Sequence, residues 1–157
     1  MSKLIAVSIL LIALLAGCVG VDKDVDVTIN DFSSWDDQQV YSFLREVFDH
    51  TQTANTMSFK TKAEIVTYYE EYFSKTLSEE IANSLFQENS NGDGWSVVQG
   101  SDGGFFVYED DEYNEITITN NKDAINFMAK YEIGLWSSVE YVIENPDHPI
   151  ITQWINK

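Results

Sequence analysis

Residues 122–135, KDAINFMAKYEIGL, decide the fold because they fit two different secondary structures. Apolar side chains occupy every second position from residue 125 onward, which is the period of a β-strand. The helical alternative would share one face among Ala124, Phe127, Met128 and Tyr131. A strand is favoured, because Asn121 is a weak helix cap and Gly134 suits a β-bulge. We therefore expect a strand over residues 122–132, with a helix as the alternative.

The chain before this stretch has helical periodicity. Residues 35–50 carry apolar side chains at helical spacing, and Ser34 before them is a favoured N-cap residue. Thr61-Lys62-Ala63-Glu64 matches a capping box and predicts the start of a second helix. A short third helix is expected from Ser78. Its inward positions are Ile81, Leu85 and Phe86.

Beyond the turn at residues 89–94 the period changes from helical to alternating. Further strands are expected over residues 95–99, 105–109, 115–119, 139–143 and 149–155, the last with a short helix as its alternative. We expect the segments 105–109 and 115–119 to pair as a hairpin. Helices followed by an antiparallel meander predict an α+β fold, with N-terminal helices packed on a curved sheet of five to six strands.

The N-terminus has the features of an export signal. Lys3 precedes an uncharged apolar run, and this run contains Leu15-Ala16-Gly17-Cys18. That tetrapeptide resembles the lipobox of bacterial lipoprotein signal peptides at all four positions. The resemblance implies cleavage between Gly17 and Cys18 and a diacylglyceryl group, with or without an N-acyl group, on Cys18. An uncleaved membrane helix and a plain secretory signal are the alternatives, although the run is at the lower limit of a spanning helix.

The sequence therefore divides into three parts: a signal peptide (1–17), an acidic tether (18–33) and a single α+β domain (34–157). Val25, Val27 and Ile29 alternate with polar residues, so a short strand is the alternative for part of the tether. The expected location is the cell membrane, with the lipid-anchored domain facing outside the cytoplasm.

The charge of the chain excludes several classes of partner. The 157 residues include 9 Lys and Arg against 26 Asp and Glu, a net charge of −17. Removal of residues 1–17 takes away Lys3 and leaves 8 basic against 26 acidic residues, a net charge of −18. Such a chain lacks the positive charge that binds phosphate, so we expect no nucleic-acid partner. The 44% apolar content excludes a wholly disordered chain.

The domain carries two further resemblances. The order of helices and strands resembles the NTF2-like or cystatin-like architecture, and Thr152-Gln153-Trp154-Ile155 is similar to the Trp-containing last strand found there. The segments 40–48 and 72–75 are similar to small uncharacterised lipoproteins of Gram-positive bacteria. Neither resemblance supplies an activity or a functional residue.

The sequence offers few residues for metal binding or catalysis. The two histidines, His50 and His148, do not follow a zinc-binding spacing, and Cys18 is the only cysteine. The turn residues Asn89, Asn91 and Asp93 resemble the first half of a calcium loop and predict at most a weak calcium site, since Gly100 stands where such a loop needs a glutamate. No motif for nucleophilic catalysis or phosphate binding is present, so we expect no enzyme and no cofactor besides the lipid on Cys18.

The expected function is that of a lipid-anchored extracytoplasmic binding module, which binds a basic protein partner and modulates cell-envelope enzymes. One alternative is a small-ligand carrier with a cavity under the sheet. Another is a hydrolase that uses two carboxylates.

Overall fold

The computed structural model describes residues 31–98, 105–131 and 137–157. Within these ranges the elements, in chain order, are η1 (Phe32–Ser34, a 3-10 helix), α1 (Asp37–Ala54), α2 (Lys62–Tyr69), α3 (Lys75–Leu85), β1 (Phe86–Glu88), β2 (Trp95–Val97), β3 (Asn114–Asn120), β4 (Ala124–Tyr131), β5 (Ser138–Glu144) and β6 (Ile150–Asn156). The predicted α+β class is confirmed. No helix in these ranges is long and apolar enough to cross a membrane.

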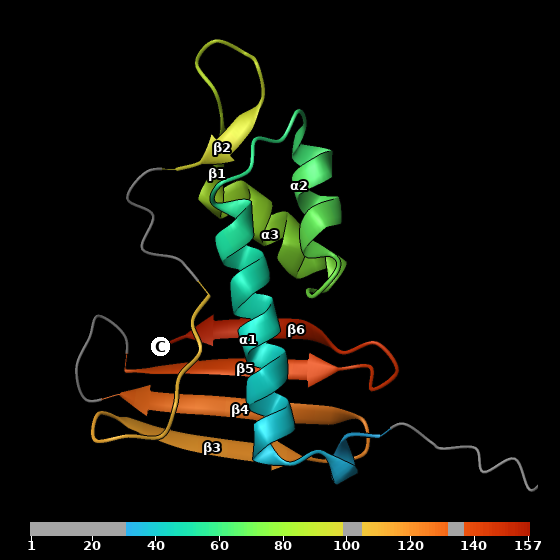
Figure 1. Ribbon diagram of the computed structural model, residues 1–157, viewed down its shortest axis with the longest axis vertical. Helices are drawn as coiled ribbons and strands as arrows, with labels where there is room; N and C mark the ends of the chain where they lie inside the picture. Colours follow the sequence, from blue (N-terminus) through green and yellow to red (C-terminus); the bar gives the residue numbers. More distant parts are fainter. Residues whose placement is uncertain (1–30, 99–104, 132–136) are drawn as a thin grey trace, which may run out of the picture.

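The strands form two antiparallel sheets. β1 pairs with β2, and the main sheet has the order β3-β4-β5-β6. The described part of the main sheet thus has four strands, fewer than the five to six expected. Figure 1 shows α1 crossing all four strands on one face of this sheet, with α2, α3 and the small sheet beyond β6.

One part of the hydrophobic core lies between α1 and the main sheet, and the same core continues into α2, α3 and β1 with Ile65, Ile81 and Phe86. Alternate residues of the central strands are buried, and those between them are half-buried or exposed. Tyr41 of α1 meets Phe127 of β4 edge to face at 6.1 Å between ring centroids. The buried strand residues are Ile125, Phe127, Ala129, Val139, Tyr141, Ile143 and Ile151. The alternation that predicted strands therefore also identifies the face that α1 covers.

The first helix begins later than the sequence suggested. Ser34 belongs to η1, and Asp36 is the N-cap of α1. The Asp36 carboxylate accepts a hydrogen bond from the Gln39 backbone N–H, and the Gln39 side chain accepts one from the Asp36 N–H, both at 2.9 Å. Asp36 is therefore the N-cap in place of Ser34, because the backbone of Trp35, which lies between these two residues, is extended.

Thr61 caps α2 as predicted, and its hydroxyl accepts a hydrogen bond from the Glu64 N–H. The predicted start of α3 at Ser78 is wrong, because Ser74 is the N-cap and the helix begins at Lys75. Ser78 is instead fully buried, and its hydroxyl donates to the Phe73 carbonyl at 3.4 Å.

The strand predicted over residues 122–132 is confirmed by β4, and the last segment of the chain forms the strand β6. The hairpin predicted between residues 105–109 and 115–119 is wrong, because β3 pairs with β4 and the segment 105–109 is not a strand. Side chains hold that segment in place: the Phe105 ring stacks on the Tyr141 ring, and the Tyr141 hydroxyl donates to the Phe106 carbonyl at 3.0 Å.

The folded region begins before the predicted boundary at residue 34. Phe32 is fully buried, and its N–H donates to the Lys122 carbonyl at 3.2 Å. Asn120 donates through its side-chain amide to the Phe32 and Trp35 carbonyls. The last residues of the predicted tether thus pack against the β3–β4 turn, whereas residues 18–30 lie outside the described ranges.

Candidate functional site

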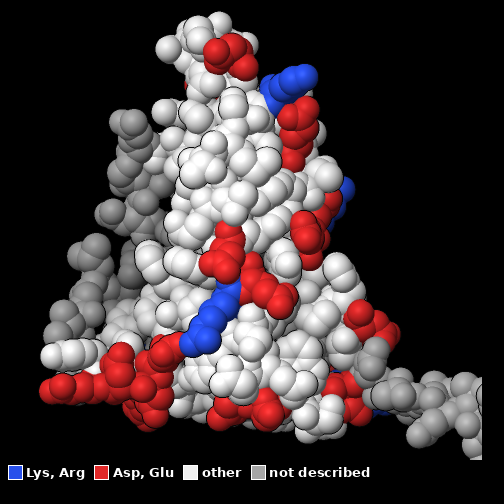
Figure 2. All heavy atoms as spheres, viewed as in Figure 1, with Lys and Arg blue, Asp and Glu red and all other residues white. Residues whose placement is uncertain are grey.

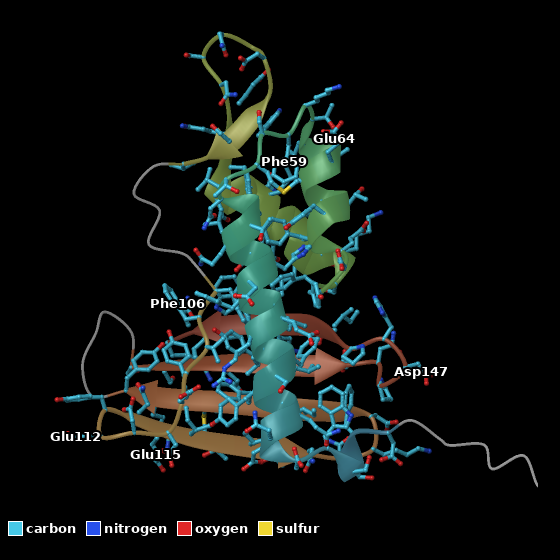
Figure 3. The ribbon with its side chains drawn as sticks, in the orientation of Figure 1. Phe59, Glu64, Phe106, Glu112, Glu115 and Asp147 are labelled. Atoms are coloured by element: carbon cyan, nitrogen blue, oxygen red, sulfur yellow. The ribbon has the colours of Figure 1, made fainter. Side chains whose placement is uncertain are left out.

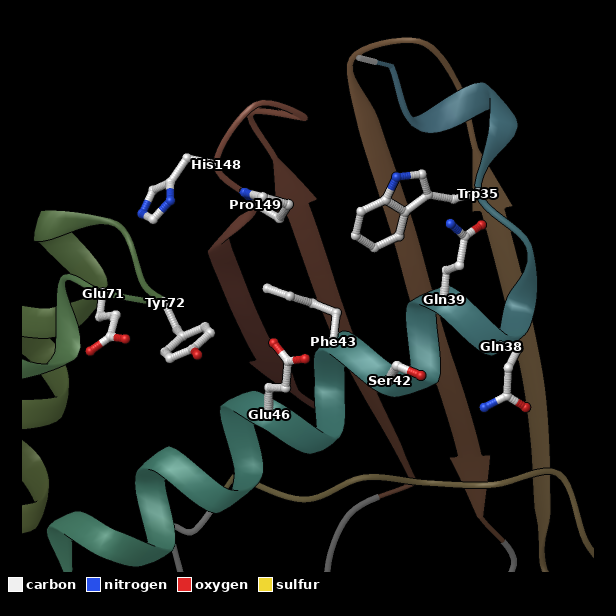
Figure 4. Close-up of a pocket in the computed structure, with 10 residues that line it drawn as sticks. All are labelled: Trp35, Gln38, Gln39, Ser42, Phe43, Glu46, Glu71, Tyr72, His148 and Pro149. Atoms are coloured by element: carbon white, nitrogen blue, oxygen red, sulfur yellow. The ribbon is translucent and has the colours of Figure 1, made fainter.

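A groove of about 480 Å³ lies between the start of α1, the connection from α2 to α3, and the turn from β5 to β6. Figure 4 shows its lining side chains facing one space from these three places. They are Trp35, Gln38, Gln39, Ser42, Phe43, Glu46, Glu71, Tyr72, His148 and Pro149. Its volume falls within the range of small-ligand pockets, roughly 300–1,000 Å³.

Aromatic rings form the apolar part of the groove. The Phe43 ring lies 6.3 Å from the Trp35 ring and 6.1 Å from the Tyr72 ring, measured between centroids. Phe43 is almost fully buried, whereas Trp35 and Tyr72 are half-buried and keep part of their surface open. The groove therefore presents the rings of Trp35 and Tyr72 to a ligand.

Two carboxylates face the same space. Burial raises the pKa of the Tyr72 hydroxyl, and the negative charges of Glu71 and Glu46 raise it further. Glu46 comes from α1 and Glu71 from the segment after α2, so the fold brings together two charges that are distant in the sequence. A neutral phenol beside two carboxylates, with open aromatic faces, makes a region of negative potential that suits a cation.

The helical repeat places the α1 residues of the groove. Gln39 lies three and four residues before Ser42 and Phe43, and Glu46 lies four and three residues after them, so the four share one face of the helix. His50, near the end of α1, packs against the two residues that come from the α2–α3 connection. Its Nδ1 lies 3.8 Å from Glu71 Oε2, and its ring is 4.9 Å from that of Tyr72.

A second groove, of about 410 Å³, lies on another face of α1. Arg45, Phe48, Asp49, Phe106 and Val107 line it. The consecutive residues Phe105 and Phe106 differ in exposure: Phe105 is 1% exposed and Phe106 is 47% exposed. Arg45 forms an ion pair with Glu109, so its positive charge is already compensated.

The inner face of the main sheet is filled by aromatic side chains. Phe105, Phe127 and Tyr141 are each at most 1% exposed, and Trp154 packs edge to face on Phe105 at 5.6 Å. A ligand under the sheet would have to displace these rings.

The predicted calcium turn is closed by its own hydrogen bonds. The side-chain amides of Asn89 and Asn91 donate to the two oxygens of Asp93 at 2.9 and 2.8 Å, and the Ser96 hydroxyl donates to Asn89 Oδ1 at 2.6 Å. A cation would have to replace these donors. Among the described residues, no group of three or more His, Cys, Asp or Glu side chains is arranged to hold a metal ion.

The predicted lipidation and cleavage residues, Cys18 and Gly17, lie outside the described ranges. The two histidines are separated by the fold: His50 packs behind the groove and His148 lies on its rim. Sequence reasoning missed the groove itself, because its residues come from three separate segments. The only sequence signal was the set of polar positions on α1 next to an aromatic residue, and this is common on surface helices.

Among the charged side chains on the face drawn in Figure 2, acidic ones outnumber basic ones. Figure 2 shows the acidic side chains over both the helical and the sheet end of this face, with few basic side chains between them. No protein-family model, no curated protein and no solved structure matches this chain.

Proposed function

We propose that this protein is a lipid-anchored binding module on the outer side of the cell membrane, and that its groove takes up a cationic group of a basic protein. The anchoring part rests on the lipobox Leu15-Ala16-Gly17-Cys18. A diacylglyceryl group at Cys18 would supply two acyl chains, enough for stable attachment at about 0.8 kcal/mol per buried CH₂.

The observation that carries the binding part is the combination of Glu46 and Glu71 with the open rings of Trp35 and Tyr72 in one groove. A lysine or arginine side chain over an aromatic face gains about 0.5–2 kcal/mol, depending on how far it is desolvated. The carboxylates would add charge-assisted hydrogen bonds to the same group. Gln38, Gln39 and Ser42 offer further acceptors along the rim.

The overall charge supports the same class of partner. With 26 acidic residues in the chain, the field of the domain attracts basic proteins and raises their association rate. The same charge repels the anionic membrane surface and favours a domain that stands away from it. Envelope enzymes with a basic surface are the partners that this arrangement would modulate.

The binding part is tested by crosslinking from inside the groove. A photoreactive amino acid at Ser42 is introduced into the full chain in its native membrane, and crosslinked products are identified by mass spectrometry. We expect one basic protein. The crosslink should be lost in the double variant Glu46→Gln/Glu71→Gln and retained in Glu79→Gln/Glu88→Gln, which removes the same charge from exposed positions outside the groove.

Equal crosslinking in the two double variants would exclude the groove as the binding site. The anchor is tested separately by labelling cells with a palmitate analogue. Wild-type chain should carry the label and partition into membranes, whereas Cys18→Ser should not. A labelled Cys18→Ser chain would contradict the proposed anchor.

A small-ligand carrier is the second candidate, because the volume of the groove also suits a small organic cation. The crosslinking experiment separates the two. A small molecule that is released when the purified protein is denatured, without a crosslinked protein, would favour the carrier.

A further inference from the structure

The strand β3 is an edge of the main sheet, and among the described residues no strand pairs with its outer side. The β3–β4 turn shows which backbone groups face outward. Asn121 N–H donates to the Ala124 carbonyl, so the Asn121–Ala124 pair is hydrogen-bonded. Alternation along the ladder then directs the N–H and C=O groups of Ile116 and Ile118 away from β4.

The sequence of this edge is nearly the same in both directions. β3 reads Asn114-Glu115-Ile116-Thr117-Ile118-Thr119-Asn120, and reversal about Thr117 changes only the pair formed by Glu115 and Thr119. The strand contains no proline or lysine, which commonly protect an exposed edge, and Glu115 is its one charged residue. An antiparallel partner with the same sequence would therefore meet a matching side chain at almost every position.

We propose that β3 pairs with β3 of a second copy, antiparallel and about a two-fold axis at Thr117, to join the two main sheets. In this register Ile116 lies opposite Ile118 of the second copy, and both residues direct their backbone groups outward, so each such pair exchanges two hydrogen bonds. Their half-buried side chains would meet on the inner face. On the outer face, Thr117 would lie opposite its symmetry mate.

The charges of the edge fit the same register. Glu115 lies opposite Thr119 rather than another glutamate, and Glu115 Oε2 is 3.7 Å from Lys130 Nζ of its own chain. Figure 3 shows Glu112 in the turn before β3 and Glu115 on the strand. The two-fold axis brings the acidic turn Asp110-Asp111-Glu112 to the level of the turn Lys122-Asp123 of the second copy, so Lys122 offers an opposite charge at each end and Asp123 adds a like one.

Cysteine crosslinking tests the register. In a Cys18→Ser background, the full chain has no other cysteine. Thr117→Cys places two thiols in a non-hydrogen-bonded pair, with Cα atoms ~4.5 Å apart, which suits a disulfide. Thr119→Cys is the matched control, because its two thiols would lie about four residues apart along the strands, roughly 13 Å. Mild oxidation should give a covalent dimer for Thr117→Cys only, and equal yields for both variants would overturn the proposal.

Sedimentation of the full-length Cys18→Ser chain tests the association without an added cysteine. Thr119→Glu would face Glu115 of the second copy, whereas Thr119→Lys would pair with it, so their dimer dissociation constants should differ by more than about tenfold. Thr67→Lys, an exposed α2 position with the same charge change as Thr119→Lys, should tighten the dimer far less. A chain that stays monomeric at all concentrations overturns the proposal. If the chain stays monomeric and a Val27→Cys/Thr117→Cys double variant forms a disulfide within one chain, residues 25–29 of the same chain would be the segment that pairs with β3.

Discussion

His50 and Tyr68 hold each other at three points. Their rings stack with centroids 3.9 Å apart and planes 14° from parallel. The Tyr68 hydroxyl donates to the His50 carbonyl at 2.9 Å, and His50 Nε2 lies 3.0 Å from the Tyr68 carbonyl, to which it donates. These contacts join α1 to α2 next to the groove and place the His50 ring behind Glu71 and Tyr72.

Loss of the His50 ring should therefore weaken both the fold and the groove. His50→Ala removes the stacking and the ring hydrogen bond, and we expect the free energy of unfolding to fall by about 2–3 kcal/mol. Tyr68→Phe keeps the ring and removes only the hydroxyl, so it should cost about 1 kcal/mol. Urea unfolding of the two variants measures both effects. If Tyr68→Phe were as costly as His50→Ala, the stacked rings would contribute little.

Gly94 and Gly92 of the β1–β2 turn provide a test substitution and its control. Gly94 has φ +140°, and a Cβ added there would collide with the Phe59 carbonyl oxygen. Gly92 has φ +74°, and a Cβ there would have nothing within 4 Å. Gly94→Ala should thus destabilise the protein by several kcal/mol, whereas Gly92→Ala should cost about 1–2 kcal/mol for its left-handed backbone alone.

The collision expected at Gly94 lies next to the backbone bridge between Phe59 and Trp95. The residues next to it pair with the chain before α2: Trp95 N–H donates to Phe59 O at 2.7 Å, and Phe59 N–H donates to Trp95 O at 3.1 Å. Hydrogen exchange of these two amides should therefore accelerate in Gly94→Ala more than in Gly92→Ala. Similar exchange rates in the two variants would show that the bridge tolerates the added methyl group.

The raised pKa values of two buried tyrosines predict that the protein loses stability at alkaline pH. Burial raises the pKa of Tyr141, and likewise that of Tyr69, above the ordinary value of 10.0. Above pH 10.0 the unfolded chain releases these protons and the folded chain keeps them, so the free energy of unfolding falls as the pH rises towards the folded-state pKa. Below pH 10.0 this contribution to stability is fully present.

Tyr141→Phe separates the titration from the packing. At neutral pH it removes the hydrogen bond to the Phe106 carbonyl and should cost about 1 kcal/mol. Above pH 10.0 its stability should fall less steeply than that of the wild type, because one titrating group is gone. Urea unfolding on both sides of pH 10.0 checks this, and parallel pH profiles for the two proteins would contradict it.

The limits of sequence reasoning follow from particular residues. Alternation alone predicted β4, because half of its side chains pack under α1 and the other half face outward. Residues 105–108 are instead a continuous apolar run, and there the Phe105 ring packs on Tyr141 although the backbone forms no strand. The spacing of apolar residues predicts which side chains are buried. It does not predict whether the backbone of that segment pairs with another strand.

The groove could not be predicted for a related reason. Glu46 and Glu71 line one groove only because α1 crosses the sheet and the α2–α3 connection docks on β6, where Ser74 N–H donates to the Ile151 carbonyl at 2.9 Å. That contact joins residues 74 and 151, and no local pattern indicates it. The cap at Thr61 was predictable because it depends on a neighbour three residues away, whereas the expected helix starts at Ser34 and Ser78 were wrong.

The adjacent residues Phe105 and Phe106 provide the clearest test of how the segment before β3 is held. Phe105 is 1% exposed, stacks on Tyr141 at 4.6 Å, and meets the rings of Phe73 and Trp154 edge to face. Phe105→Ala leaves a cavity among these rings and should lower the free energy of unfolding by about 3–5 kcal/mol.

Phe106→Ala is its control, because Phe106 is 47% exposed and its backbone carbonyl, which accepts from Tyr141, stays in place. It should cost less than about 1 kcal/mol, as exposed positions usually do. Denaturant unfolding of both variants gives the difference directly. Since the segment 105–109 has no strand ladder, side-chain packing is what must hold it, and a Phe105→Ala variant as stable as Phe106→Ala would mean that other contacts hold the segment on the sheet.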